Sequence, residues 1–199
     1  MKQHFDPKTV NYDLPEDRIA LYPLPERDQS KLLIMPKGED APLNAHFHEI
    51  SKLIPVDSLM FVNVSKVIHA RIHCKKESGG MVEVLLNEPA LGAPADAMLH
   101  IGQSDWKCII GGKKIIAGMM LQTLDEQADL QIEVLEKHGM DAIVRLQWNG
   151  VQTLSDILEK IGKIPLPPYL NREAEEEDEE RYQTVYAKDE GSVAAPTAG

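Results

Sequence analysis

The chain has 199 residues, 43% of them hydrophobic and 27% charged, with 13 glycines, 13 prolines and two cysteines. This composition excludes collagen-like, low-complexity and wholly disordered chains, and two cysteines cannot form a disulfide framework. No apolar run approaches the roughly 18 residues of a membrane helix, and the first residues lack the apolar stretch of a signal peptide. We therefore expect a globular cytoplasmic protein that does not enter a membrane.

The formal net charge of −11 is concentrated in one place. Seven acidic residues lie within 173–180, and without them the rest of the chain carries −4. Residues 66–76, by contrast, hold four basic side chains, two histidines and no acid. The average charge therefore does not exclude a nucleic-acid partner. We expect the acidic run to be a mobile, solvated connection.

The first 62 residues predict short elements separated by prolines. Residues 14–20 suit a short helix, and residues 31–35 suit a strand. Residues 48–54 carry apolar side chains at helical spacing and precede Pro55, which ends a helix. Residues 59–62 (LMFV) predict a buried strand.

From about residue 66 to 147, the sequence predicts short strands separated by turns. Candidate strands cover residues 67–74, 81–86, 97–101, 114–116, 120–124, 130–135 and 142–147. Short strands at this spacing, without long helices between them, favour a small antiparallel barrel or sandwich.

The remaining residues predict one helix, a stiff proline-rich segment and a last strand. Thr153 and Asp156 have the spacing of a capping box, and Gly162 is a natural stop for the helix that follows them. Residues 164–169 are rich in proline. Residues 182–186 have polar side chains at alternate positions, which a strand would place on one face.

General catalytic motifs are absent from the sequence. Neither a phosphate-binding loop nor a Rossmann glycine fingerprint is present, and residues 111–114 (GGKK) suit a turn. His46 and His48 form one close pair, and His69, His73 and Cys74 form another group. Neither group has a matched second pair of ligands, so we expect no metal site.

Three stretches of the sequence carry a family resemblance. The first comprises residues 14–23 (LPEDRIALYP), Arg27 and residues 30–33 (SKLL). The second runs from residues 67–71 (VIHAR) to 78–85 (SGGMVEVL). The third runs from 165–169 (PLPPY) through 182–187 (YQTVYA) to 193–199 (VAAPTAG). Together, in this order and over essentially the whole chain, they resemble the family S-adenosylmethionine:tRNA ribosyltransferase-isomerase of queuosine biosynthesis.

The resemblance implies a fold and a domain division. The family has an α/β (α+β) core domain interrupted by a small antiparallel β-barrel. We therefore expect a discontinuous core from residues 1–71 and 151–199, and a barrel insert at residues 72–150. Family members continue past the motif in which this chain stops, so we expect the core to be truncated at its C-terminal end.

The resemblance also implies a reaction and its substrates. S-adenosylmethionine would act as the ribosyl donor, with no metal. Its ribosyl part would be transferred and isomerised onto 7-aminomethyl-7-deazaguanine at the wobble position of the tRNA anticodon loop. The products would be epoxyqueuosine, adenine and methionine. The rival interpretations are a non-catalytic barrel that binds RNA on an incomplete core, and an S-adenosylmethionine enzyme with another acceptor.

Several residues in the matching stretches are candidates for this site. For catalysis, polar contacts to the departing adenine are expected from Tyr182, Thr184, Tyr186 and Thr197. For substrate binding, the candidates are Arg27, Asn63, Lys66, Arg71, Pro196, Ala198 and Gly199. One departure is Val64, which stands where the family has a polar side chain. The alternatives are tyrosines that pack on a core edge and basic residues on a solvated strand face.

The expected RNA contacts are basic. The candidates for phosphate binding are Lys75, Lys76, Lys113 and Lys114, with Lys107 as a further one. Trp106 and Trp148 suit either stacking on an unpaired base or burial in the barrel.

Overall fold

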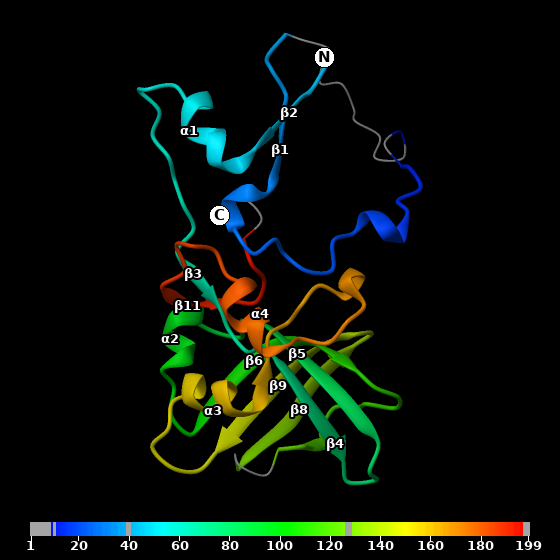
Figure 1. The fold of residues 1–199 in the computed structure, drawn as a ribbon. Coiled ribbons are helices and arrows are strands. Elements are labelled where there is room, and N and C mark those ends of the chain that lie inside the picture. Colours follow the sequence, from blue (N-terminus) through cyan, green and yellow to red (C-terminus); the bar gives the residue numbers. More distant parts are fainter. Residues whose placement is uncertain (1–8, 10, 39–40, 126–128, 197–199) are drawn as a thin grey trace, which may run out of the picture. The chain divides into compact units, whose positions relative to one another are not determined.

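The computed structural model describes residues 9, 11–38, 41–125 and 129–196 (Figure 1). The chain divides into two compact units, residues 1–59 and 60–199. The first unit contains a two-stranded antiparallel hairpin and brief helical turns. Its elements are η2 (Glu16–Arg18), η3 (Arg27–Gln29), β1 (Lys31–Ile34), β2 (Leu43–His46), η4 (Phe47–Glu49) and α1 (Ile50–Leu53). No described residue of this unit is buried.

The predicted elements of the first 62 residues are confirmed except one. The strand at 31–35 is β1, and the helix at 48–54 is η4 followed by α1. The helix at 14–20 is a single 3-10 turn, η2. The predicted buried strand at 59–62 is wrong, because these residues form no regular element and expose their side chains. Apolar residues alone did not make a strand here, since no described strand pairs with them.

The second unit is built on a closed antiparallel barrel of six strands. These are β4 (Arg71–Lys76), β5 (Met81–Pro89), β6 (Gln103–Gly111), β7 (Met120–Thr123), β8 (Leu130–His138) and β9 (Asp141–Trp148). They follow the order β4-β5-β6-β9-β8-β7, and β7 pairs back with β4 to close the barrel. Closure leaves no unpaired edge to attract another strand. Figure 1 shows the barrel in green to yellow.

Alternating sequence explains why these strands close around one core. Along β6, every second residue is buried, including Trp106, Cys108 and Ile110. The same alternation holds in β5 and β9, so each strand turns one face inward. Trp106 is fully buried, and its indole Nε1 donates to Ser104 Oγ at 3.0 Å. The core therefore accommodates the indole without leaving its N–H unpaired.

Seven further elements accompany the barrel. They are β3 (Ser65–Val67), α2 (Pro94–Met98), α3 (Leu154–Ile161), β10 (Gly162–Lys163), η5 (Pro168–Leu170), α4 (Glu176–Arg181) and β11 (Asp189–Ser192). β3 and β11 form a parallel pair, and β10 extends the barrel sheet beside the first residues of β4. α3 begins with the predicted capping box, in which Thr153 and Asp156 bond each other reciprocally.

The fold class is confirmed: helices and a parallel strand pair accompany an antiparallel barrel. Two predicted strands are wrong. Of residues 97–101, Ala97 and Met98 end helix α2, which begins at Pro94, and the other three form no strand; residues 114–116 lie in a turn region after β6. β6 itself was missed. The division into a discontinuous core and an insert at residues 72–150 stays a prediction.

One expectation near the C-terminal end is also wrong. Residues 182–186 form turns rather than a strand, so Tyr182, Thr184 and Tyr186 do not share a strand face. Within the acidic run, residues 176–180 form most of helix α4, and every acidic side chain except Asp178 is exposed, as expected of a solvated segment, while its mobility stays a prediction. Helix formation is possible because Asp178 turns inward and meets a buried partner, Arg172.

Candidate functional site

The structure brings together residues from the second and third matching stretches. Val67 is buried in a small apolar cluster with Ile164 and Leu166, separate from the barrel core. Tyr182 and Ala195 pack against this cluster. Segments more than 100 residues apart in the sequence therefore meet at one place. We call this group of five residues the β3 cluster.

Tyr182 is half-buried in the β3 cluster, and its environment keeps its phenol neutral. Burial is the main influence and raises the pKa of Tyr182, while a hydrogen bond with the backbone of Ala195 acts in the opposite direction. A neutral phenol can still donate a hydrogen bond to a ligand nitrogen. The contact also places Tyr182 beside the residue that precedes Pro196.

Thr184 lies close to Asn63, two residues that the sequence separates by 121 positions. Thr184 Oγ1 donates to the Asn63 carbonyl oxygen at 3.4 Å. The Asn63 side chain is turned to Ser65, whose N–H donates to Asn63 Oδ1 at 2.8 Å. Tyr186 is exposed, so it is available to solvent rather than packed with Tyr182.

The basic candidates near β3 already have partners. Lys66 Nζ lies 3.5 Å from Glu190 Oε1, across the parallel pair, and Glu190 also accepts a hydrogen bond from Ser155 of α3. Arg71 Nη2 donates to the Leu166 carbonyl oxygen at 3.2 Å, so Arg71 lies beside the β3 cluster. If Lys66 and Arg71 bind substrate, they do so while also contacting Glu190 of β11 and the Leu166 carbonyl oxygen.

Four predicted site residues lie outside the second unit or outside the described residues. Arg27 belongs to the first unit, where it forms part of η3. Thr197, Ala198 and Gly199 lie outside the described residues.

The predicted phosphate-binding lysines gather at one end of the barrel. Lys76 Nζ donates to the Lys113 carbonyl oxygen at 2.9 Å, which joins the β4–β5 hairpin to the turn after β6. Lys75 and Lys76 end strand β4, and Lys113 and Lys114 lie in the turn after β6, so four lysines belong to these two segments. We call them the lysine end. Lys107 lies elsewhere and is paired with Glu88 at 2.7 Å.

The tryptophans serve the core and not an exposed stacking surface. Trp106 is fully buried, and Trp148 is 5% exposed. The Trp148 Nε1 donates to the Gln152 carbonyl oxygen at 2.8 Å. The alternative of burial in the barrel is therefore confirmed for both.

No described histidine belongs to a group of three or more potential metal ligands. His73 Nε2 lies 3.4 Å from Glu83, and His69 Nε2 lies 3.7 Å from Glu179. The rings of His46 and His48 stack with their centres 5.8 Å apart. Within the described part of the chain, no group of three or more potential ligands is found.

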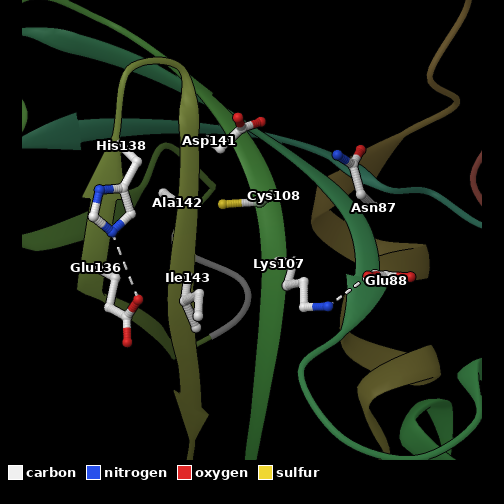
Figure 2. A pocket seen from close by; sticks show the side chains of 9 residues that line it. All are labelled: Asn87, Glu88, Lys107, Cys108, Glu136, His138, Asp141, Ala142 and Ile143. Atoms are coloured by element: carbon white, nitrogen blue, oxygen red, sulfur yellow. Dashed lines mark hydrogen bonds and ion pairs between the residues drawn. The ribbon is translucent and has the colours of Figure 1, made fainter.

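A hollow of about 350 Å³ lies on the barrel and includes no residue of the β3 cluster (Figure 2). It crosses β5, β6, β9 and β8, at the bulges near Glu88 and Glu136. In Figure 2, Lys107 points to Glu88, and His138 points to Glu136. Asp141 also lines the hollow and belongs to neither pair. Of the predicted site residues, Lys107 alone lines it.

Both cysteines should react slowly with thiol reagents in the folded protein. Cys74 and Cys108 are buried, and burial raises the pKa of each thiol to about 12. The reactive thiolate is therefore scarce at neutral pH. We expect labelling by a chromogenic disulfide reagent to be at least ~100-fold slower in buffer than in denaturant. Fast labelling of either cysteine in the native protein would contradict this.

Three features around the β3 cluster were not predicted from the sequence. They are the Gln183 side chain, which bonds to Val67, the ion pair of Arg172 with Asp178, and the close contacts of Gly162. The capping-box spacing of Glu175 and Asp178 was one available signal for α4. No local pattern pairs residue 183 with residue 67.

Comparison with known proteins places the chain in a family. Residues 8–199 match the family described as queuosine biosynthesis protein. S-adenosylmethionine:tRNA ribosyltransferase-isomerase of Trichlorobacter lovleyi is 36% identical over 96% of this chain, and that of Aliarcobacter butzleri is 38% identical over 96%. The enzyme of the same name from Aromatoleum aromaticum is 40% identical over 95%.

The match covers this chain far more completely than it covers the relatives. The chain spans about half the length of the curated relatives, 52%, 54% and 50% respectively. A crystal structure of S-adenosylmethionine tRNA ribosyltransferase from Thermotoga maritima matches 80% of this chain and 51% of its own, with 28% identity and a TM-score of 0.33. No described helix is long and apolar enough to span a membrane. The extent of the family match shows that the chain belongs to the queuosine biosynthesis protein family.

Proposed function

We propose that the chain takes part in transfer of the ribosyl part of S-adenosylmethionine to 7-aminomethyl-7-deazaguanine in the tRNA anticodon loop. One observation carries this proposal. Val67, Leu166, Tyr182 and Ala195 come from separated family stretches and pack into one cluster. The named relatives are ribosyltransferase-isomerases, which supports this reaction for the protein.

The chemistry requires adenine to leave and the aminomethyl group to attack. Adenine leaves more easily when its ring nitrogens receive hydrogen bonds, because these stabilise the negative charge that develops on it. A neutral Tyr182 phenol and the Thr184 hydroxyl are donors of the required kind. We propose that they contact the leaving adenine, with Asn63, Lys66 and Arg71 binding the rest of the substrate. Tyr186, Thr197 and Arg27 remain further candidates, as do Pro196, Ala198 and Gly199.

Adenine release tests this proposal. The chain is incubated with S-adenosylmethionine and tRNA that carries the aminomethyl-deazaguanine, and adenine and methionine are quantified. We expect Tyr182→Phe to lower kcat/KM for adenine release at least about tenfold, because it removes one hydrogen bond to the leaving group. Tyr12→Phe, at an exposed tyrosine, is the control and should leave the rate unchanged. Absence of adenine release from the parent chain would contradict the catalytic role.

The lysine end favours RNA as a partner, and it also supports the rival of an RNA-binding barrel. Arg71 and Lys76 lie five residues apart along β4, which corresponds to about 17 Å. One RNA molecule is long enough to reach from the lysine end to the β3 cluster. Binding without adenine release would favour the rival interpretation.

Neutralising two lysines should weaken RNA binding in a salt-dependent way. We expect Lys113→Gln with Lys114→Gln to lower affinity for tRNA several-fold at low salt. The magnitude of the slope of log K against log salt should fall by roughly 1 to 2, because each phosphate contact that is lost reduces the number of counterions released on binding. Lys107→Gln is the matched control, since Glu88 already neutralises that charge. Equal salt slopes for the double variant and the parent chain would contradict phosphate binding at the lysine end.

A further inference from the structure

We propose that Gln183 is the positioning residue that holds residues 182–184 against β3. Both polar atoms of its carboxamide meet the backbone of Val67. The Val67 N–H donates to Gln183 Oε1 at 2.7 Å, and Gln183 Nε2 donates to the Val67 carbonyl oxygen at 2.9 Å. A residue of an antiparallel neighbouring strand would make the same two bonds. The side chain therefore takes the place of a strand residue at this edge.

The pairing of β3 leaves this edge open to side chains. β11 and the residue before it bond to the backbone of Val64 and Ile68. Successive residues of a strand present their backbone groups to alternate edges, so Ser65 and Val67 face the other edge. At Ser65, the N–H bonds to Asn63 Oδ1. Together with the carboxamide at Val67, side chains therefore bond both N–H groups on this edge of β3.

The position of Gln183 explains how its two neighbours are placed. Tyr182 packs into the β3 cluster, and Thr184 Oγ1 reaches the Asn63 carbonyl oxygen. Residues 182–186 form turns with no strand ladder of their own to fix them. Val67 is 1% exposed, so its backbone is a rigid support. Anchoring the middle residue to that support sets the direction of both flanking side chains. Their role at the leaving adenine rests on the proposed function.

Amide exchange tests the anchor without reference to activity. In Gln183→Leu, which keeps the volume and loses both bonds, we expect the Val67 amide to exchange about tenfold faster or more. Amides of β9 should keep their protection, which shows that the barrel is still folded. Gln122→Leu, at an exposed glutamine on β7, is the matched control. Unchanged Val67 protection in Gln183→Leu would overturn the proposal.

The variant Gln183→Glu separates the two hydrogen bonds. An ionised carboxylate accepts from the Val67 N–H but repels its carbonyl oxygen, whereas a protonated carboxyl can make both contacts. Because repulsion by the Val67 carbonyl oxygen displaces the whole carboxylate from this edge, we expect Val67 protection relative to the parent chain to be low at neutral pH and to recover as pH falls through about 4 to 5. Gln183→Leu should show no such recovery. Equal pH behaviour of the two variants would argue against the paired geometry and overturn the anchor.

Adenine release then separates this inference from the proposed function. If the parent chain releases adenine, Gln183→Leu should lower kcat, and Gln183→Glu should regain activity in parallel with Val67 protection. Loss of protection without any loss of kcat would overturn the positioning role. If the parent chain releases no adenine, the proposed function fails, while the exchange measurements still decide whether Gln183 anchors residues 182–184.

Discussion

Replacing Gly162 with alanine should lower the free energy of unfolding of the second unit by about 3 kcal/mol, which corresponds to a fall in Tm of roughly 10 °C. Gly162 ends α3 and begins β10, where it pairs with Ile72 of β4. A Cβ at this position would collide with the His69 carbonyl oxygen and lie 2.7 Å from the Leu158 carbonyl oxygen. Both are backbone atoms, so relief requires α3 or β10 to move away from the barrel.

The matched control is Gly111→Ala. A Cβ at Gly111 would meet its nearest neighbour, the Glu83 Cβ, at 3.9 Å, which is an ordinary contact. We expect its unfolding free energy to stay within about 1 kcal/mol of the parent chain. Thermal and urea unfolding, followed by far-UV circular dichroism, measure both variants. Equal stability of Gly162→Ala and Gly111→Ala would show that α3 and β10 can separate from β4 at no cost.

The barrel was predictable because its signal is local. In β5, β8 and β9 the buried positions largely coincide with apolar residues that alternate with polar ones in the sequence, and turns separate the strands. β6 carries the same alternation, yet a serine and an indole stand at its inward positions in place of aliphatic residues. α2 was mistaken for a strand although Pro94 stands at its first turn, a position that proline favours in helices.

The candidate site was predictable only as a set of residues, and not as an arrangement. The family resemblance pointed to Tyr182 and Thr184, but alternation alone suggested a strand that does not form. Their placement depends on contacts with Val67 and Asn63, more than 100 positions away. Side chain to backbone bonds of this kind leave no periodic trace in a sequence. The phosphate-binding candidates are a contrasting case, since one bond from Lys76 to the Lys113 carbonyl oxygen joins the two segments that carry them, while their role in RNA binding stays a prediction.

Breaking the ion pair between Arg172 and Asp178 should destabilise α4 and the adjoining Tyr182. The pair is bidentate, with nitrogen to oxygen distances of 2.6 and 2.7 Å, and the two side chains are 12% and 7% exposed. The Asp178 carboxylate also accepts from the Glu175 N–H, and its carbonyl oxygen accepts from the Tyr182 N–H. We expect Arg172→Leu to cost about 2 to 3 kcal/mol, because it leaves a buried carboxylate without its cation.

The pH dependence of this pair has a definite sign. The hydrogen bonds from Arg172 are the main influence and lower the pKa of Asp178, against the opposing effect of burial. A depressed pKa in the folded state contributes stability above the ordinary pKa of about 3.9. That contribution is lost as pH falls through the lower pKa of the folded state. The stability difference between the parent chain and Arg172→Leu should therefore be full at neutral pH and shrink below about pH 4.

A double-mutant cycle distinguishes the ion pair from simple loss of packing. Replacing both Arg172 and Asp178 with leucine removes the two charges together, so no buried charge remains unpaired. We expect this double variant to be more stable than either single variant, which is the non-additivity typical of a buried pair.

The bidentate pair of Arg145 with Asp105 is a matched control on the barrel. Its side chains are 34% and 30% exposed, so water can solvate either charge and the coupling should be smaller. Additive losses at Arg172 and Asp178 would show that α4 is held by its apolar contacts instead, and that the charge pair does not position Tyr182.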